Sequence, residues 1–167
     1  MDFQKELIAE YDREAATTRK ILDALPADID FTYKPNPKSM ALGRLAGHVA
    51  ETTGEWALET LTKDKLIFEP GHKFEQYIPA SKEALLERLD REVPQVKAAL
   101  ASLDTAKWDE KWQMGANGQI WIENTKYRVW REWVISHVAH HRAQLGVYLR
   151  ALGHKLPGTY GPSADEM

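Results

Sequence analysis

The chain of 167 residues contains no cysteine. A cysteine-free protein has no disulfide, no thiolate metal ligand and no cysteine nucleophile. Any metal site must therefore be built from histidine and carboxylate side chains. The absence of cysteine is also typical of a cytoplasmic protein, and we expect that location.

Long apolar runs and a strong excess of one charge are missing as well. No stretch approaches the roughly 18 consecutive apolar residues of a membrane span. Residues 1–20 carry charges every few positions and lack the apolar centre of a signal peptide. The formal net charge is only −3, with acids and bases interspersed, so the basic stripe of a nucleic-acid-binding protein is absent. We expect no membrane partner and no nucleic-acid partner.

The length and composition predict one domain over residues 1–167. Hydrophobic residues make up 43% of the chain and charged residues 28%, which is the balance of an ordinary soluble globular protein. A chain of this length can bury a sizeable core without splitting into two domains.

Apolar residues recur at helical spacing in four segments of the chain. The predicted helices cover approximately residues 3–25, 40–62, 82–103 and 125–152. Ser39 and Ser81 are predicted N-caps of the second and third helices, and Gly153 is the predicted residue after the end of the fourth. Pro94 lies inside the third helix and is expected to kink it, because proline removes a backbone hydrogen bond.

The connections between these helices differ in length. The segment 63–80 has about 18 residues, which is long for adjacent antiparallel helices and could let the second and third helices run parallel. Asn117-Gly118 stands between "KWQM" and "QIWI" and indicates either a hairpin turn or a loop. The pattern as a whole predicts an all-α protein, a four-helix bundle.

Three of the six histidines fall within five residues of the fourth predicted helix, at His137, His140 and His141. His137 and His141 lie four residues apart on the apolar stripe, so two imidazoles can point at one ion. His140 is rotated by about 100° from His141 and is expected to face outward or to sit at the rim.

A catalytic zinc-type site usually has three protein ligands, and the third must come from elsewhere in the chain. His48 is the best candidate because it borders the apolar stripe of the second predicted helix. His72 falls in a loop, and His154 falls in the tail. The alternative is a helical scaffold without metal, in which these histidines are hydrogen-bonded core residues.

Charged residues stand close to the candidate ligands in the sequence. Glu51 and Glu55 lie one and two turns after His48, where either could be a fourth ligand, a partner that orients an imidazole, or part of a solvated helix face. Arg44 and Arg142 could hold an anionic substrate or could be solvated as well.

Several segments resemble the DinB-like (YfiT-like) metal-dependent family, namely "TYKPNPKSMALGRLAGHVAET", "HVAHHRAQLGVYLRALG" and "LPGTYGPSADE". The strongest part is the H-x-x-x-H-R-x-Q element over residues 137–144, combined with one histidine on the second helix. The resemblance implies an up-down-down-up bundle that holds a divalent metal through His48, His137 and His141. One departure is Ala143, where many relatives carry glycine.

The resemblance also implies a homodimer and an enzymatic activity. The first expectation is a thiol-dependent S-transferase acting on a small electrophile with a low-molecular-weight thiol, which must be supplied from outside this cysteine-free chain. A metal-dependent hydrolase and a non-catalytic metal-binding stress-response module are the alternatives. An all-nitrogen site accepts several transition metals, of which zinc and nickel are expected. No catalytic residue is identified beyond the candidate ligands.

The region before the fourth helix is rich in tryptophan. Trp108, Trp112 and Trp121 give it a large apolar surface, which either covers the core or forms a dimer contact.

Overall fold

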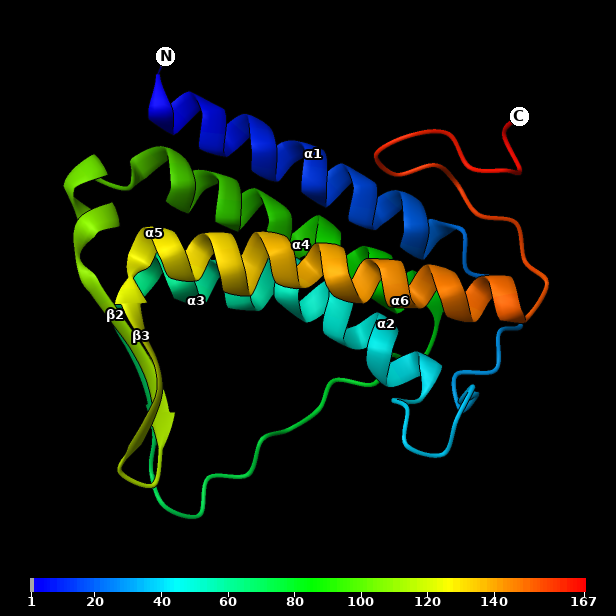
Figure 1. The fold of residues 1–167 in the computed structure, drawn as a ribbon, viewed down its shortest axis with the longest axis horizontal. Helices are drawn as coiled ribbons and strands as arrows, with labels where there is room; N and C mark the ends of the chain where they lie inside the picture. The colour runs from blue at the N-terminus through cyan, green and yellow to red at the C-terminus, as the bar shows by residue number, and fades with distance from the viewer. Residues whose placement is uncertain (1) are drawn as a thin grey trace.

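The computed structural model describes residues 2–167, which form four long helical segments and a small sheet (Figure 1). The helices are α1 (Phe3–Asp23), α2 (Leu42–Glu51), α3 (Ala57–Thr62), α4 (Lys82–Ser102), α5 (Lys126–Val129) and α6 (His137–Ala151). The strands are β1 (Lys65–Phe68), β2 (Lys111–Ala116) and β3 (Gln119–Thr125), and a 3₁₀ turn, η2, covers Thr105–Asp109.

Two of the helical segments contain a π-helical turn that the sequence analysis did not predict. The turn η1 (Thr52–Trp56) joins α2 to α3, and the turn η3 (Trp130–Ser136) joins α5 to α6. A π turn has more residues per turn than an α-helix, and such turns are frequent at functional sites. Both turns adjoin the helices that carry the candidate ligands.

The predicted cap of α4 is confirmed, because the Ser81 hydroxyl accepts a hydrogen bond from the Ala84 N–H at 3.2 Å. The helix then continues through Pro94 to its end at Ser102. Gly153 follows α6 with a φ of +83°, as expected for a helix C-terminus.

The predicted cap of the second helix is wrong. The helix begins at Leu42, after Ala41, and no side chain caps it. The preceding linker caps it with its own backbone, because the carbonyls of Tyr33 and Phe31 accept the N–H groups of Leu42 and Gly43 at 2.9 and 2.8 Å. Ser39 therefore has no such role.

The three-stranded sheet corrects the all-α prediction. Strands β2 and β3 form an antiparallel hairpin, and Asn117 and Gly118 at its turn have φ values of +52° and +75°. Positive φ at both positions is the requirement of a type I′ turn, so the hairpin alternative holds and the loop alternative does not. Strand β1 adds in parallel to β2, with Lys65 opposite Gln113 and Phe68 opposite Ala116.

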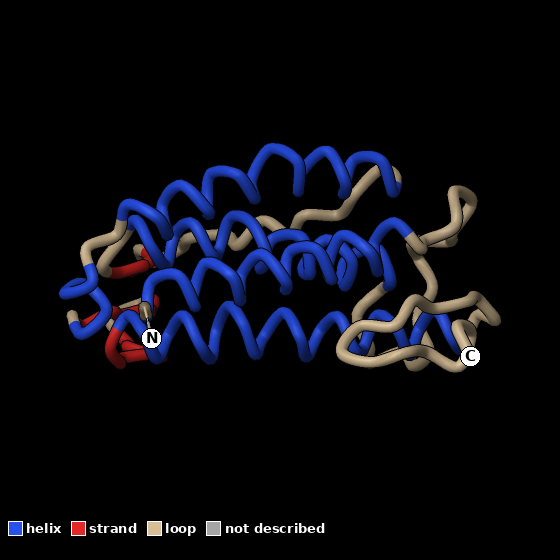
Figure 2. The backbone as a smooth tube through the Cα atoms, turned by 90° about the horizontal axis from the view of Figure 1, so that it is seen from above, coloured by secondary structure: helices blue, strands red, loops and turns tan. Residues whose placement is uncertain are grey.

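The sheet marks one end of the molecule. Strand β1 follows α3, η2 follows α4, and β3 leads into α5. The start of α1 lies at the same end, since the Gln4 side chain bonds to the Leu100 carbonyl and to the Trp108 indole. In Figures 1 and 2, α1 and α5–α6 leave the sheet end, and α2–α3 and α4 run towards it. The segment 69–81 returns along the helices to the start of α4 (Figure 1).

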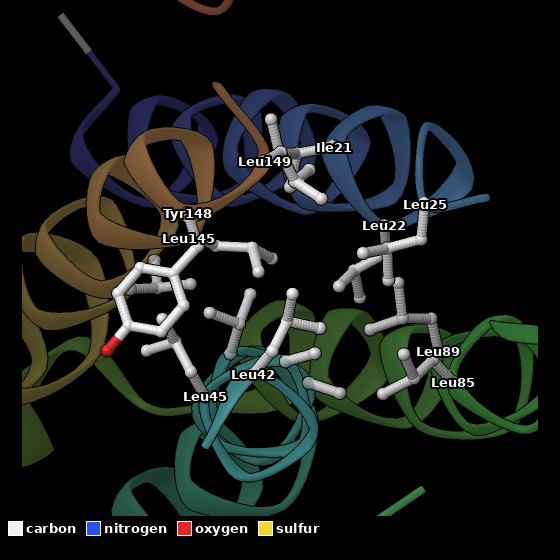
Figure 3. Packing of buried hydrophobic residues seen from close by; sticks show 14 residues of the cluster. Ile21, Leu22, Leu25, Leu42, Leu45, Leu85, Leu89, Leu145, Tyr148 and Leu149 are labelled. Carbon is white, nitrogen blue, oxygen red and sulfur yellow. The ribbon is translucent and has the colours of Figure 1, made fainter. Parts of the chain in front are cut away.

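The core lies between the helices, where apolar side chains from α1, α2, α4 and α6 meet (Figure 3). A second buried cluster, around Trp108 and Trp130, fills the sheet end. Trp108 and Trp112 are 2% and 1% exposed and therefore cover the core, whereas Trp121 is 52% exposed. No described helix is long and apolar enough to cross a membrane.

Candidate metal centre

Three imidazoles from two helices converge on one point. His48 on α2 and His137 and His141 on α6 bring ring nitrogens within 4.8 Å of one another. The Nε2 atoms of His48 and His137 are 2.9 Å apart. Because Zn–N bonds are about 2.0–2.1 Å long, neighbouring ligand nitrogens stand roughly 3 Å apart. The three histidines therefore fit a divalent ion.

The remaining histidines do not join this group. His140 is exposed, as expected, although its ring contacts that of His141 at 4.8 Å between centroids. His72 is exposed and stacks on Phe68 in the segment that follows β1. His154 lies beyond α6, outside the three-histidine cluster.

Burial keeps the imidazoles of His137 and His141 neutral. The pKa of His137 is lowered to about 4, chiefly by burial and in addition by the neighbouring His141, His48 and His140. Burial also lowers the pKa of His141 to about 4, against an opposing hydrogen bond to Gln144. The Gln144 Oε1 lies 2.8 Å from His141 Nδ1, so Nδ1 donates its proton to the amide oxygen and Nε2 keeps its lone pair. Neutral imidazole is the form that binds metal.

Glu51 stands behind His48 rather than in the converging group. Its Oε2 accepts a hydrogen bond from Arg44 Nη1 at 2.6 Å and lies 3.6 Å from His48 Nδ1. Its Oε1 accepts the N–H of Tyr77 at 3.1 Å. Burial acts to raise the pKa of Glu51, but the neighbouring His48 ring and the hydrogen-bonded Arg44 guanidinium outweigh it and lower the pKa. The sequence left Glu51 as a fourth ligand, a partner that orients an imidazole, or a solvated residue. The geometry favours the orienting role, with His48 as the imidazole.

The sequence pattern of the DinB family matches residues 1–167. This chain belongs to the DinB family. Its fold resembles a DinB-like protein from Bacillus cereus ATCC 10987, with a TM-score of 0.64 and 22% identity over 90% of this chain and 93% of that one. It also resembles the DinB-like protein YjoA from Bacillus subtilis, with a TM-score of 0.65 and 17% identity over 92% of this chain and 97% of that one. No similar sequence was found among curated proteins.

Other charged residues of this DinB-family protein are engaged away from the histidines. Glu55 is paired with Arg88 at 2.6 Å. Arg142 is 2% exposed and bonds to Glu14 on α1, so it is neither a solvated arginine nor a contact for an anionic substrate. The reason is its position, since a residue one step after His141 is rotated by about 100° and here faces α1.

Two tryptophans flank the histidines, and the sequence analysis did not single them out as part of the site. Trp56 and Trp133 each stack on His137, with ring centroids 5.9 and 5.7 Å away and interplanar angles of 24° and 23°. Trp56 also meets the edge of His48 at 5.4 Å. The spacing of four residues between Trp133 and His137 is the one signal in the sequence that places these rings on one face.

Proposed function

We propose that this DinB-family protein binds one divalent metal ion through His48, His137 and His141 and acts as a metal-dependent enzyme. The observation that carries the proposal is the convergence of three buried or half-buried imidazoles from two helices. The low pKa values of His137 and His141 support it, because both rings stay neutral at physiological pH.

An open coordination position favours catalysis over a structural role. A structural zinc usually has four protein ligands, whereas a catalytic zinc has three and leaves a position for water or substrate. The residues that could close the shell lie outside the converging group, since Glu51 is bonded to Arg44, Glu55 is bonded to Arg88, and His140 faces outward. The same observation counts against a non-catalytic metal-binding module.

We infer thiol-dependent S-transfer to a small electrophile as the reaction, with a low-molecular-weight thiol as the second reactant. An ion held by three neutral ligands keeps its full charge and would supply Lewis acidity that lowers the pKa of a bound thiol. The protein's own residues hold His137 and His141 neutral by burial, orient His48 through Glu51, and cover His137 with two tryptophan rings. Zinc or nickel suits the all-nitrogen donor set.

We further propose the up-down-down-up four-helix bundle and a cytoplasmic homodimer. The helix directions in Figure 1 support the bundle order. The exposed side chains of Phe74, Ile120 and Trp121 offer apolar surface for a second copy. Sedimentation of the purified protein tests the dimer.

Bound metal is the first measurement. The protein is loaded with zinc or nickel, passed over a desalting column and analysed for metal by elemental analysis. We expect one ion per chain in the wild type, none in His48→Ala, His137→Ala or His141→Ala, and a full complement in His140→Ala. A wild type that retains no metal, or a His140→Ala variant that loses it, would contradict the assignment.

The reaction is tested next with metal-loaded protein. Bacillithiol or mycothiol is mixed with 1-chloro-2,4-dinitrobenzene, and formation of the thioether is followed as the C–S bond forms, chloride leaves and the thiol proton passes to solvent. Metal-dependent turnover that His137→Ala abolishes supports S-transfer. Turnover of 4-nitrophenyl acetate without any thiol would instead favour the hydrolase.

A further inference from the structure

The two tryptophans beside the metal centre come from the two helical segments that carry the histidines. Trp56 closes the π turn η1 after α2, and Trp133 lies in the π turn η3 before α6. Both rings stack on His137 and both are only half-buried. In contrast, the core tryptophans Trp112 and Trp130 are 1% and 0% exposed.

The π turn brings Trp56 onto the face of the ligands. Eight residues separate it from His48, which in a regular α-helix leaves the two side chains about 80° apart. A π turn rotates less per residue, which reduces this angle, and the two rings meet at 5.4 Å. A π turn disturbs the regular hydrogen-bond ladder, and here it places an aromatic ring at the site.

The apolar surface continues from Trp133 across the sheet. Trp133 packs against the cluster of Trp112, Ile122 and Val129, together with the half-buried Leu66 and Met114. In register, Leu66, Met114 and Ile122 share one face of the sheet, and the polar row Lys65, Gln113 and Glu123 lies on the other.

Aromatic side chains extend this surface towards the hairpin and the segment after β1. The ring centroids of Phe68 and Phe74 are 4.7 Å apart, and those of Phe74 and Trp121 are 6.2 Å apart. Phe74 and Trp121 are 55% and 52% exposed. The surface beside His137 is therefore apolar and aromatic, which is the usual lining of a small-molecule site.

We propose that the metal centre takes a substrate whose metal-binding or reactive group is joined to a flat apolar body, an aromatic ring in the simplest case. The body lies against the free surfaces of Trp56 and Trp133, where offset or edge contacts between rings are favourable. This inference rests on the proposed metal centre and names the class of its substrate. Tryptophans that merely sealed the histidines would be buried like those of the core.

A matched pair of metal-binding probes tests the inference without the natural substrate. Acetohydroxamate and benzohydroxamate chelate metal with the same group and differ in a methyl or a phenyl substituent. Their affinities for zinc-loaded protein are measured by calorimetry and are compared with their affinities for free zinc. We expect the protein to favour benzohydroxamate by about 10-fold more than free zinc does, because the ring is buried against tryptophan.

Variants assign the preference to the two rings. Trp56→Leu and Trp133→Leu should each lower the preference by about threefold or more, with acetohydroxamate affinity and zinc content unchanged. Phe3→Leu is the control, because this aromatic side chain is also partly exposed but lies at the start of α1 against Trp108 and Tyr127, so its loss should leave the preference intact. Zinc content and far-UV circular dichroism are recorded for every variant.

The outcomes separate this inference from the proposed function. Binding of both hydroxamates with the same preference as free zinc would overturn the aromatic substrate and leave the open metal site standing. The same holds if both tryptophan variants keep the full wild-type preference. If neither hydroxamate binds zinc-loaded protein, the open position is removed and with it both proposals.

Discussion

Arg142 Nη2 lies 2.6 Å from Glu14 Oε2, and the two side chains are only 2% and 7% exposed. The Arg142 guanidinium also donates to the Glu14 carbonyl at 3.0 Å and to the Thr18 hydroxyl at 3.2 Å. The Tyr160 hydroxyl donates to the same carboxylate at 2.7 Å. This network joins α1, α6 and the C-terminal tail. Its central residue, Arg142, directly follows the candidate metal ligand His141 in the sequence.

Removal of the arginine should therefore destabilise the metal-free protein. Arg142→Ala leaves the Glu14 carboxylate buried without its cation, and we expect a loss of about 3–5 kcal/mol in the free energy of unfolding. Urea denaturation measures the loss. The control is Arg19→Ala, which breaks an ion pair with Asp90 whose side chains are 47% and 63% exposed and should cost less than about 1 kcal/mol. Equal losses in the free energy of unfolding for the two variants would show that the buried Arg142 ion pair stabilises the protein no more than an exposed one.

Glu51 should control the affinity for metal without being a ligand. Its carboxylate and the Arg44 guanidinium both approach His48 Nδ1, at 3.6 and 3.4 Å. The Glu51 carboxylate can accept a hydrogen bond from Nδ1–H, which leaves the Nε2 lone pair free for metal, whereas donation from Arg44 to Nδ1 would place the proton on Nε2. Glu51→Gln weakens the first contact, and we expect zinc affinity to fall by about 10–100-fold.

Competition with a chromogenic chelator measures this change. Glu55→Gln is the matched control on the same helical segment, since Glu55 is 54% exposed and paired with Arg88. It should leave zinc affinity within about twofold of the wild type, because it touches none of the histidines. Loss of affinity in the Glu55 variant, or none in the Glu51 variant, would contradict the positioning role.

The stability of the metal-free protein should fall as the pH drops from about 6.5 towards 4. His137 and His141 have pKa values of about 4 in the folded state, lowered from 6.5 chiefly by burial. Between these values the unfolded chain binds protons that the folded chain does not, so unfolding becomes easier as the pH falls. Above pH 6.5 both states are neutral and the stability is fully present.

Urea denaturation between pH 7 and pH 5 checks this expectation. The loss should be on the order of 2–3 kcal/mol in the wild type and much smaller in the double variant His137→Asn, His141→Asn. The range stops at pH 5 because the lowered pKa of Glu51 adds its own loss of stability at more acidic pH. A double variant with the wild-type pH profile would place the titration on other groups.

Helical spacing, the apolar stripes of two predicted helices and the family resemblance together were enough to predict the histidine cluster. His137 and His141 share a face by helical geometry, and His48 was chosen because it borders the apolar stripe of its own helix. The structure brings these three together. The ends of the four helical segments were each predicted to within two residues, because the apolar periodicity of these segments is strong.

Features that depend on contacts between segments were not predictable in this way. Strand β1 has only four residues and owes its conformation to pairing with β2, which is far away in the sequence. The start of α2 is fixed by linker carbonyls rather than by Ser39. The π turns and the burial of Arg142 likewise follow from packing against other helices, which local periodicity does not record.

Two helical glycines should respond in opposite ways to alanine. A Cβ at Gly47 on α2 would lie 2.3 Å from the backbone oxygen of Tyr77, in the segment 69–81 that crosses the helix beside Glu51. Backbone cannot move aside as a side chain does, so Gly47→Ala should cost about 1–3 kcal/mol in the free energy of unfolding. A Cβ at Gly146 on α6 would meet only Leu156, at 3.8 Å. Gly146→Ala should therefore stabilise the protein by about 0.5–1 kcal/mol, because alanine is the better helix former.

Thermal and urea unfolding of both variants measure these effects. Because Gly47 adjoins the segment that donates the Tyr77 N–H to Glu51, its substitution should also weaken zinc binding, whereas that of Gly146 should not. A Gly47→Ala variant as stable as the wild type, with unchanged zinc affinity, would mean that the segment 69–81 does not hold Glu51 in place. A coupled loss of stability and affinity would show that close packing of this segment on α2 is part of what orients His48.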